Sequence, residues 1–286
     1  MEAVVWQWGP FSIAVFSLAF FVAVISGLFI TFAEGRAKHL PEQRIIDFIA
    51  LSLVSGIAGS RLVYALFFDL AYYLENPIHL VRLQDGGLSF WGGLAVAVIT
   101  VFIWAIRKKV IIERYLDTAA PALAAGLALG HIGALLRGKP MHYPYPWGIR
   151  AGELLYHPDG AYMIIFLVAL LFVIRRRRSK LAYEGELFVW FLAGYGLLNF
   201  GVEFFRTGTP FLGLLTAGQV AALAVLLFIF LFMLGGSKIY TASYSTWKLD
   251  QGQSKFGPFL RLIWYLGLTA LLIALYFYVR QPFSFL

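Results

Sequence analysis

Eight apolar runs, most of them long enough to cross a lipid bilayer, constrain this chain more than any other feature. A helix needs about 20 mostly apolar residues to cross a hydrocarbon core of about 30 Å. The runs cover residues 11–32, 45–67, 88–106, 116–136, 160–174, 187–205, 213–234 and 262–279, of which the fifth is short. We therefore predict an all-α polytopic membrane protein with about eight transmembrane helices.

The composition supports this class and excludes others. The chain is 60% hydrophobic and 13% charged, whereas soluble domains are about 45–50% apolar and about 25% charged. It has no cysteine, which excludes disulfides, thiolate metal sites and cysteine nucleophiles. We expect no cofactor and no metal. The net charge of +8 fits basic loops beside a bilayer, so we expect a lipid partner and no nucleic acid.

The distribution of lysine and arginine predicts the orientation. The loops after the first, third, fifth and seventh runs hold 16 of the 23 basic residues, and the opposite side holds 6. Basic residues gather in cytoplasmic loops. Both termini should therefore face away from the cytoplasm.

Two segments on the extracytoplasmic side are unusual. Residues 69–87 carry tyrosines and charges, which predicts a short interfacial arm of amphipathic helix. Residues 137–158 are rich in Pro, Tyr, Gly and His, which favours turns over helix.

Several ionisable residues lie in or beside the runs, where they are costly and often functional. Asp47 and Asp117 lie in the first turn of their runs, where a helix favours an anion, so we interpret them as structural. Arg61 lies deeper and has no such explanation. The other polar residues form two groups.

The first group is a stripe of Tyr195, Asn199, Glu203 and Arg206, which fall within an arc of about 80° on one helix face. A structural ion pair between Glu203 and Arg206, at i and i+3, is an equal alternative to a functional role.

The second group lies at the outer end of the fourth run, where His131 is followed by Arg137 and Lys139. Glycines at 126, 130 and 133 allow close helix approach there. A packed core histidine is the alternative interpretation of His131.

A glycine-rich turn at residues 85–93 could present backbone N–H groups to an anion. Together with the nearby cations, it suggests a cavity for a lipid headgroup. The predicted headgroup-binding residues are Arg61, Arg137, Lys139, Glu203, Arg206, Ser89, Gly92 and Gly93.

Short motifs along residues 9–210 resemble those of the prolipoprotein diacylglyceryl transferase family. The matching pieces are residues 9–10, 59–64, 76–77, 85–93, 130–133, 157–158 with Tyr162, 194–196 and 202–206. Members of that family are bacterial inner-membrane enzymes. They move a diacylglyceryl group from phosphatidylglycerol to the lipobox cysteine of a preprolipoprotein and release glycerol phosphate. The resemblance implies this activity, these substrates and this location.

The resemblance also implies a domain organisation. Residues 1–234 would form the seven-helix membrane domain of the family. Residues 235–261 would be a cytoplasmic linker, and residues 262–286 would add a C-terminal transmembrane helix.

The chain departs from the family pattern at several polar positions. Trp91 stands where the family has a histidine, and His131 and Asn199 each stand where it has an arginine. His157 and Tyr162 of a further family motif are kept.

Forming a thioether requires a base for the thiol and cations for the leaving phosphate. An indole cannot act as a base, so Trp91 cannot do what a histidine does. We predict His131 as the base, Arg61 and Arg137 on the phosphate, and Tyr195 on a glycerol oxygen.

Two other functions remain open. One is a non-catalytic relative that binds phospholipid or lipoprotein in the same cavity. The other is an unrelated transporter, for which internal repeats and broken spans would be expected.

Overall fold

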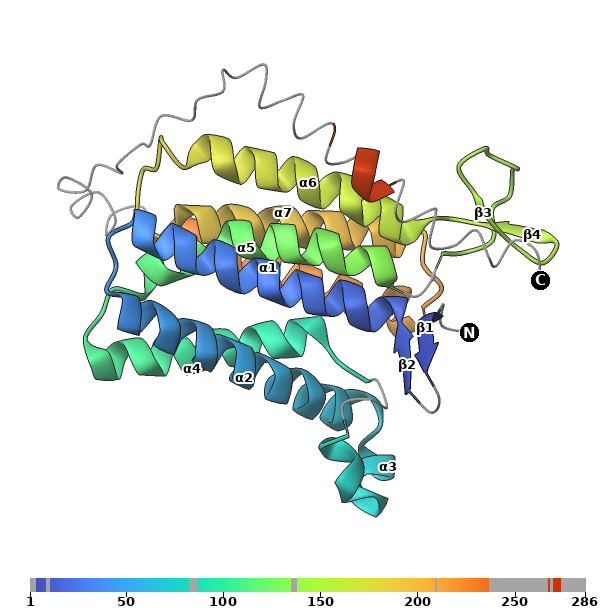
Figure 1. Ribbon diagram of the computed structural model, residues 1–286, viewed down its shortest axis with the longest axis horizontal. Coiled ribbons are helices and arrows are strands. Elements are labelled where there is room, and N and C mark those ends of the chain that lie inside the picture. Colours follow the sequence, from blue (N-terminus) through green and yellow to red (C-terminus); the bar gives the residue numbers. More distant parts are fainter. Residues whose placement is uncertain are drawn as a thin grey trace. The chain divides into compact units, whose positions relative to one another are not determined.

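The computed structural model describes residues 4–8, 11–82, 87–134, 138–208, 210–236, 267 and 270–273, and these are mostly helical (Figure 1). The helices are α1 (Val15–Ala37), α2 (Glu42–Phe68), α3 (Leu70–Glu75), the 3-10 helix η1 (Pro77–Leu80), α4 (Phe90–Lys108), α5 (Ile112–Gly133), α6 (Asp159–Arg177), α7 (Glu186–Glu203) and α8 (Ala217–Gly236). Each of the first seven predicted runs coincides with a helix. The eighth run and the linker before it lie largely outside the described residues.

Three of these helices are long and apolar enough to cross a membrane: Ser17–Ala37, Glu42–Phe68 and Phe90–Lys108. Many large apolar side chains on the helices are exposed, among them Phe29 at 72%. Contiguous exposed apolar surface of this kind is unfavourable in water. The architecture is that of a mostly helical membrane protein.

Within the described residues three short antiparallel hairpins accompany the helices, and the structure stays consistent with the predicted all-α membrane protein. They are β1 (Val4–Trp8) with β2 (Phe11–Ala14), β3 (Ile149–Ala151) with β4 (Leu154–Tyr156), and β5 (Pro210–Leu212) with β6 (Leu215–Thr216). The first predicted run therefore begins as a strand. Periodicity alone does not separate a short apolar strand from the start of a helix. The segment predicted to form turns likewise contains a hairpin, β3–β4.

The chain divides into two compact units. One consists of Met1–Thr31 and Leu116–Leu286, and the other of Phe32–Tyr115. In the first unit α7 packs against α6 and α8, and the β3–β4 hairpin extends beyond the start of α6 (Figure 1). In the second unit α2 packs along α4. The short helix predicted for the arm is present there as α3 and η1, and its place at the membrane interface stays a prediction.

Small residues allow the helices within each unit to approach closely. A Cβ at Gly126 of α5 would lie 3.2 Å from the carbonyl oxygen of Ala23 in α1, which confirms the predicted close approach at this glycine. In the second unit a Cβ at Gly93 of α4 would lie only 2.8 Å from the carbonyl oxygen of Gly56 in α2. Such contacts match the way membrane helices pack.

The buried carboxylate of Asp117 joins α5 to the start of α7. It accepts hydrogen bonds from the backbone N–H groups of Gly185, at 2.9 Å, and Phe188, at 3.2 Å. The first N–H groups of a helix have no partner within the helix and favour a negative charge. The structural interpretation of Asp117 is confirmed, although its role is to cap α7 rather than its own helix.

Candidate functional site: a polar cluster and an adjoining pocket

The backbone after α5 brings the start of α6 and the end of α7 together. The N–H group of Lys139 donates to the carbonyl of Phe205 at 2.7 Å, and the carbonyl of Lys139 accepts from the N–H group of His157 at 3.0 Å. Gly138 also pairs with Arg206 in an isolated antiparallel bridge. A Cβ at Gly138 would overlap the carbonyl oxygen of His157, so this position requires glycine.

Arg206 lies at the centre of a polar cluster. Its Nε donates to Asp159 Oδ2 at 2.8 Å, and its Nη1 contacts Glu203 Oε2 and Asn199 Oδ1, each at 3.3 Å. Asp159 and Asn199 are only 3% and 6% exposed. The predicted ion pair between Glu203 and Arg206 is confirmed. Asp159, the first residue of α6, is a closer partner that the sequence analysis did not identify.

The charge of Arg206 is fully compensated within this cluster. Burial alone would lower the pKa of its guanidinium, but the charges of Asp159 and Glu203 and their hydrogen bonds outweigh burial and raise that pKa. Arg206 therefore stays protonated. Two carboxylates face one guanidinium, so the cluster is not a net cationic site.

The same cluster reaches the start of α8. Thr216 Oγ1 donates to Glu203 Oε1 at 3.0 Å. Thr216 and Gln219 form a capping box, in which each backbone N–H group donates to the other's side-chain oxygen. One polar network therefore links α6, α7 and α8.

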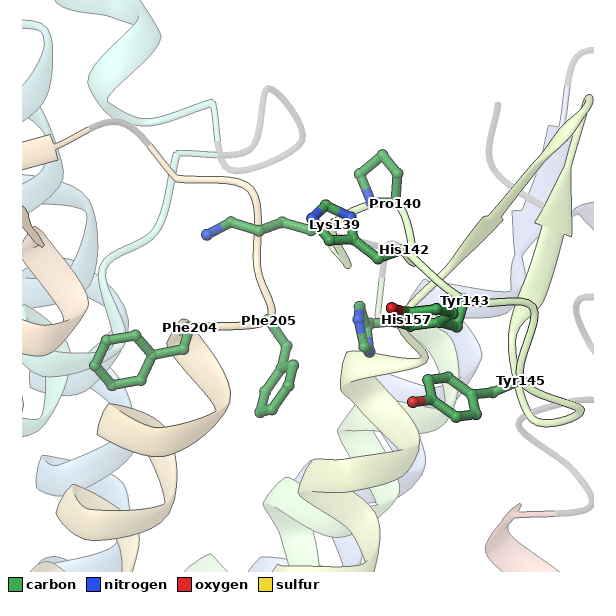
Figure 2. Close-up of a pocket in the computed structure, with 8 residues that line it drawn as sticks. All are labelled: Lys139, Pro140, His142, Tyr143, Tyr145, His157, Phe204 and Phe205. Atoms are coloured by element: carbon green, nitrogen blue, oxygen red, sulfur yellow. The ribbon is translucent and has the colours of Figure 1, made fainter.

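A cavity of about 290 Å³ adjoins this network. Figure 2 shows Phe204 and Phe205 on one side of it, Tyr143 and Tyr145 on the other, and His157 between them. Three of the lining side chains are basic and none is acidic. The full lining is Lys139, Pro140, His142, Tyr143, Tyr145, His157, Phe204 and Phe205.

His157 is held in place by its neighbours. Its Nδ1 lies 3.1 Å from the hydroxyl of Tyr162 in α6, and its ring centroid lies 5.0 Å from that of Phe205. Burial lowers the pKa of His157. The ring is therefore neutral at neutral pH, since an unperturbed histidine has a pKa of about 6.5.

In the second unit, Arg61 is 3% exposed and anchors the arm that contains α3 and η1. Its guanidinium donates to the backbone carbonyls of His79, Leu80, Arg82 and Gly87. It also lies over the ring of Tyr73, 5.1 Å from the ring centroid. Binding a phosphate here would require some of these hydrogen bonds to break.

Ser89, Gly92 and Gly93 form the start of α4 in the same unit. Ser89 is the N-cap: its Oγ accepts from the N–H group of Gly92 at 3.2 Å, and its carbonyl accepts from the N–H group of Gly93 at 2.9 Å. Both glycine N–H groups therefore have partners within the helix start. Their predicted contact with an anion remains a prediction.

The remaining predicted residues lie in the first unit. His131 is half-buried in the last turn of α5. Tyr195 is buried in α7, where its ring stacks on Phe191 at 5.8 Å. Arg137 lies outside the described residues. Along the described ranges, no three His, Asp or Glu side chains gather where they could hold a metal ion.

The family model for prolipoprotein diacylglyceryl transferase matches residues 3–234. The chain belongs to the prolipoprotein diacylglyceryl transferase family. The match confirms the resemblance carried by the short motifs, and it includes both the polar cluster around Arg206 and the arm held by Arg61.

Individual relatives support the family assignment. The chain is 33% identical to the phosphatidylglycerol–prolipoprotein diacylglyceryl transferase of Bordetella parapertussis over 73% of this chain and 84% of the relative. It is 32% identical to the protein of the same name from Coxiella burnetii, over 79% and 92% of the two chains. For that of Bacillus cereus the identity is 27%, over 82% and 92%.

The structure shows the neighbours of Trp91 and Asn199, two residues that differ from the family pattern. Trp91 is half-buried near the start of α4, with its ring 5.4 Å from that of Phe90. Asn199 is buried beside Arg206 and accepts a hydrogen bond from it. At position 199 this chain therefore has a neutral amide that accepts a hydrogen bond from Arg206. The resemblance implies a second cation, an arginine, at that position.

Proposed function

We propose that this protein transfers a diacylglyceryl group from phosphatidylglycerol to the cysteine thiol of a prolipoprotein. In this reaction the sulfur forms a bond to the glycerol carbon, the bond from that carbon to the phosphate oxygen breaks, and glycerol phosphate leaves. The thiol proton passes to a base. The observation that carries the proposal is the family match along residues 3–234.

The roles of individual residues are part of the proposal. His131 would take the thiol proton, with Tyr195 on a glycerol oxygen. Arg61, Arg137 and Lys139 would act on the phosphate, and Ser89, Gly92 and Gly93 would line the headgroup site. Arg206 and Glu203 would border that site, and their mutual pairing supports a positioning role for both.

Activity can be measured directly on the full chain reconstituted in phosphatidylglycerol vesicles. We expect a synthetic lipobox peptide to gain the mass of one diacylglyceryl group and free glycerol phosphate to appear in equal amount. Vesicles of phosphatidylcholine alone provide the matched control. If the peptide stays unmodified with phosphatidylglycerol, the transferase proposal fails and a lipid- or lipoprotein-binding role replaces it.

The proposal includes the membrane arrangement. The protein would be a multi-pass inner-membrane protein with eight spans and both termini extracytoplasmic. Residues 1–234 would form the catalytic domain, residues 235–261 a cytoplasmic linker, and residues 262–286 an extra span. The three strongly apolar helices and the excess of basic residues in alternate loops support this arrangement.

The absence of cysteine from the chain makes the orientation easy to test. In intact cells, a membrane-impermeant thiol reagent should label an Arg150→Cys variant and leave a Lys180→Cys variant unlabelled. Both residues are exposed, so each should react once the membrane is permeabilised. The reverse pattern would show that the orientation is wrong.

A further inference from the structure

The end of α4, in the second unit, carries three consecutive cations. Arg107, Lys108 and Lys109 are all exposed, and within the described part of the chain none of the three forms an ion pair. Residues 107–114 hold four basic residues and a single acid, Glu113. The connection from α4 to α5 therefore has an excess of positive charge.

The neighbouring helix does not neutralise this charge. α4 runs beside α2 in the opposite direction (Figure 1), and the rings of Phe48, near the start of α2, and Trp104, near the end of α4, lie 6.5 Å apart. The start of α2 therefore lies beside the end of α4. Residues 34–47, which lead into α2 and form its start, hold three basic and three acidic residues. The net charge at this end of the unit is therefore that of α4.

Lys109 has a backbone conformation that lysine rarely adopts. Its φ of 52° and ψ of 48° are left-handed, and the next N–H group, that of Val110, donates to the carbonyl of Ala105 at 3.0 Å. Glycine is the usual residue at this position of a helix end, because it has no Cβ. Histidine is enriched in the left-handed region, which accounts for His39 at φ 52°, whereas lysine is not. Lys109 therefore costs stability, and a ligand for its ammonium group would explain its presence.

An apolar stripe leads along α4 to these cations. Ile99, Phe102 and Ile106 are exposed and follow one another at intervals of three and four residues, so they lie on one helix face. Lys109 comes three residues after Ile106 and continues the same face. In a membrane protein, this order places acyl chains along the stripe and the charged level of the bilayer at its basic end.

We propose that the end of α4 binds the phosphate of an anionic phospholipid through Arg107, Lys108 and Lys109, with the acyl chains along the apolar stripe. Guanidinium and ammonium groups form charge-assisted hydrogen bonds with phosphate oxygens, and clustered cations beside a bilayer favour anionic lipids. A zwitterionic head gains less, because it carries its own cation.

This site is separate from the residues proposed to act in diacylglyceryl transfer. Ser89 and Gly92 lie at the start of α4, and Arg61 contacts the carbonyl of Gly87 just before it. The 19 residues of α4, at about 1.5 Å each, place its two ends about 28 Å apart. The inference therefore goes beyond the proposed function and does not depend on it.

The test measures which lipid lies against the end of α4. The chain has no cysteine, so Ile106→Cys provides a single site for a fluorescent dye, and lipids with brominated chains quench a dye that they contact. The labelled full chain is placed in phosphatidylcholine vesicles that contain increasing fractions of brominated phosphatidylserine or brominated phosphatidylcholine. Phosphatidylserine supplies an anionic head without being the proposed donor of the diacylglyceryl group.

We expect half-maximal quenching at an about tenfold lower fraction of brominated phosphatidylserine than of brominated phosphatidylcholine. Each cation near an anionic surface contributes about fivefold, and salt should weaken the preference. The matched control is a dye at Val54→Cys, an exposed apolar position in the middle of α2, where both lipids should quench equally.

Variants assign the preference to the cations. The triple variant Arg107→Gln/Lys108→Gln/Lys109→Gln should abolish it. Lys109→Gly should lower it about fivefold and, because glycine relieves the left-handed conformation, raise the thermal unfolding midpoint by about 2–4 °C. His39→Gly, which relieves the same conformation but removes no lysine or arginine, should leave the lipid preference unchanged.

Two outcomes would overturn the proposal: equal quenching by both lipids at position 106, or a preference that persists in the triple variant. If the triple variant does not fold, Lys109→Gly decides, and an unchanged preference in that variant refutes the site. The quenching readout does not require transfer activity. An inactive chain that prefers the anionic lipid would refute the proposed function alone, and an active chain without the preference would refute this site alone.

Discussion

Replacing Arg206 with glutamine should lower the free energy of unfolding by about 3–5 kcal/mol. The substitution leaves the carboxylates of Asp159 and Glu203 without the guanidinium that pairs with both. Their side chains are only 4% and 15% exposed, so water cannot take over its role. Equilibrium unfolding of the detergent-solubilised chain measures the loss. Arg150→Gln, at an exposed position, is the matched control and should change the unfolding free energy by less than about 0.5 kcal/mol.

A double-mutant cycle tests whether this loss of stability comes from the interaction between Asp159 and Arg206. Asp159→Asn alone should cost less than Arg206→Gln, because Glu203 and Asn199 continue to bind Arg206. The combined Asp159→Asn/Arg206→Gln variant should be more stable than the sum of the two losses predicts, by about 0.5–3 kcal/mol. Strict additivity, or an Arg206→Gln variant as stable as the unaltered chain, would show that the network contributes nothing.

The second large effect concerns His131 and catalysis. If His131 is the base, His131→Gln should lower the rate of diacylglyceryl transfer about 100-fold or more, since a positioned base contributes about 10²–10⁴-fold. The measurement is the transfer assay with the lipobox peptide.

The control for this substitution is His39→Asn. His39 is exposed and has a positive φ of 52°, a conformation that asparagine tolerates. The His39→Asn variant should transfer the diacylglyceryl group at the normal rate. An undiminished rate in His131→Gln would remove His131 from the mechanism without touching the enzyme assignment.

The helices were predictable because each rests on a local signal. An apolar run of bilayer length specifies a helix wherever it folds, and seven of the predicted runs coincide with helices in the described residues. The start of α1 was misplaced for the opposite reason. Phe11–Ala14 is short and apolar, and its pairing with Val4–Trp8 is not contained in its own periodicity.

The candidate site was only partly predictable. The pair of Glu203 and Arg206 follows from helical spacing, but Asp159 lies 47 residues from Arg206 in the chain and no pattern connects them. The pocket is assembled by backbone hydrogen bonds of Lys139 to Phe205 and His157. The available signals were an acid at the first position of α6 and the kept pair of His157 and Tyr162.

The anchoring of the arm by Arg61 has a consequence for how this region can change. Arg61 recognises main-chain oxygens, and every residue type supplies the same oxygen. Substitutions at His79, Leu80 or Arg82 therefore alter what the arm displays without loosening its attachment to α2. Variation at these three positions can therefore change the surface of the arm while Arg61 keeps its main-chain contacts, whereas Tyr73, whose ring lies against the guanidinium, must stay aromatic.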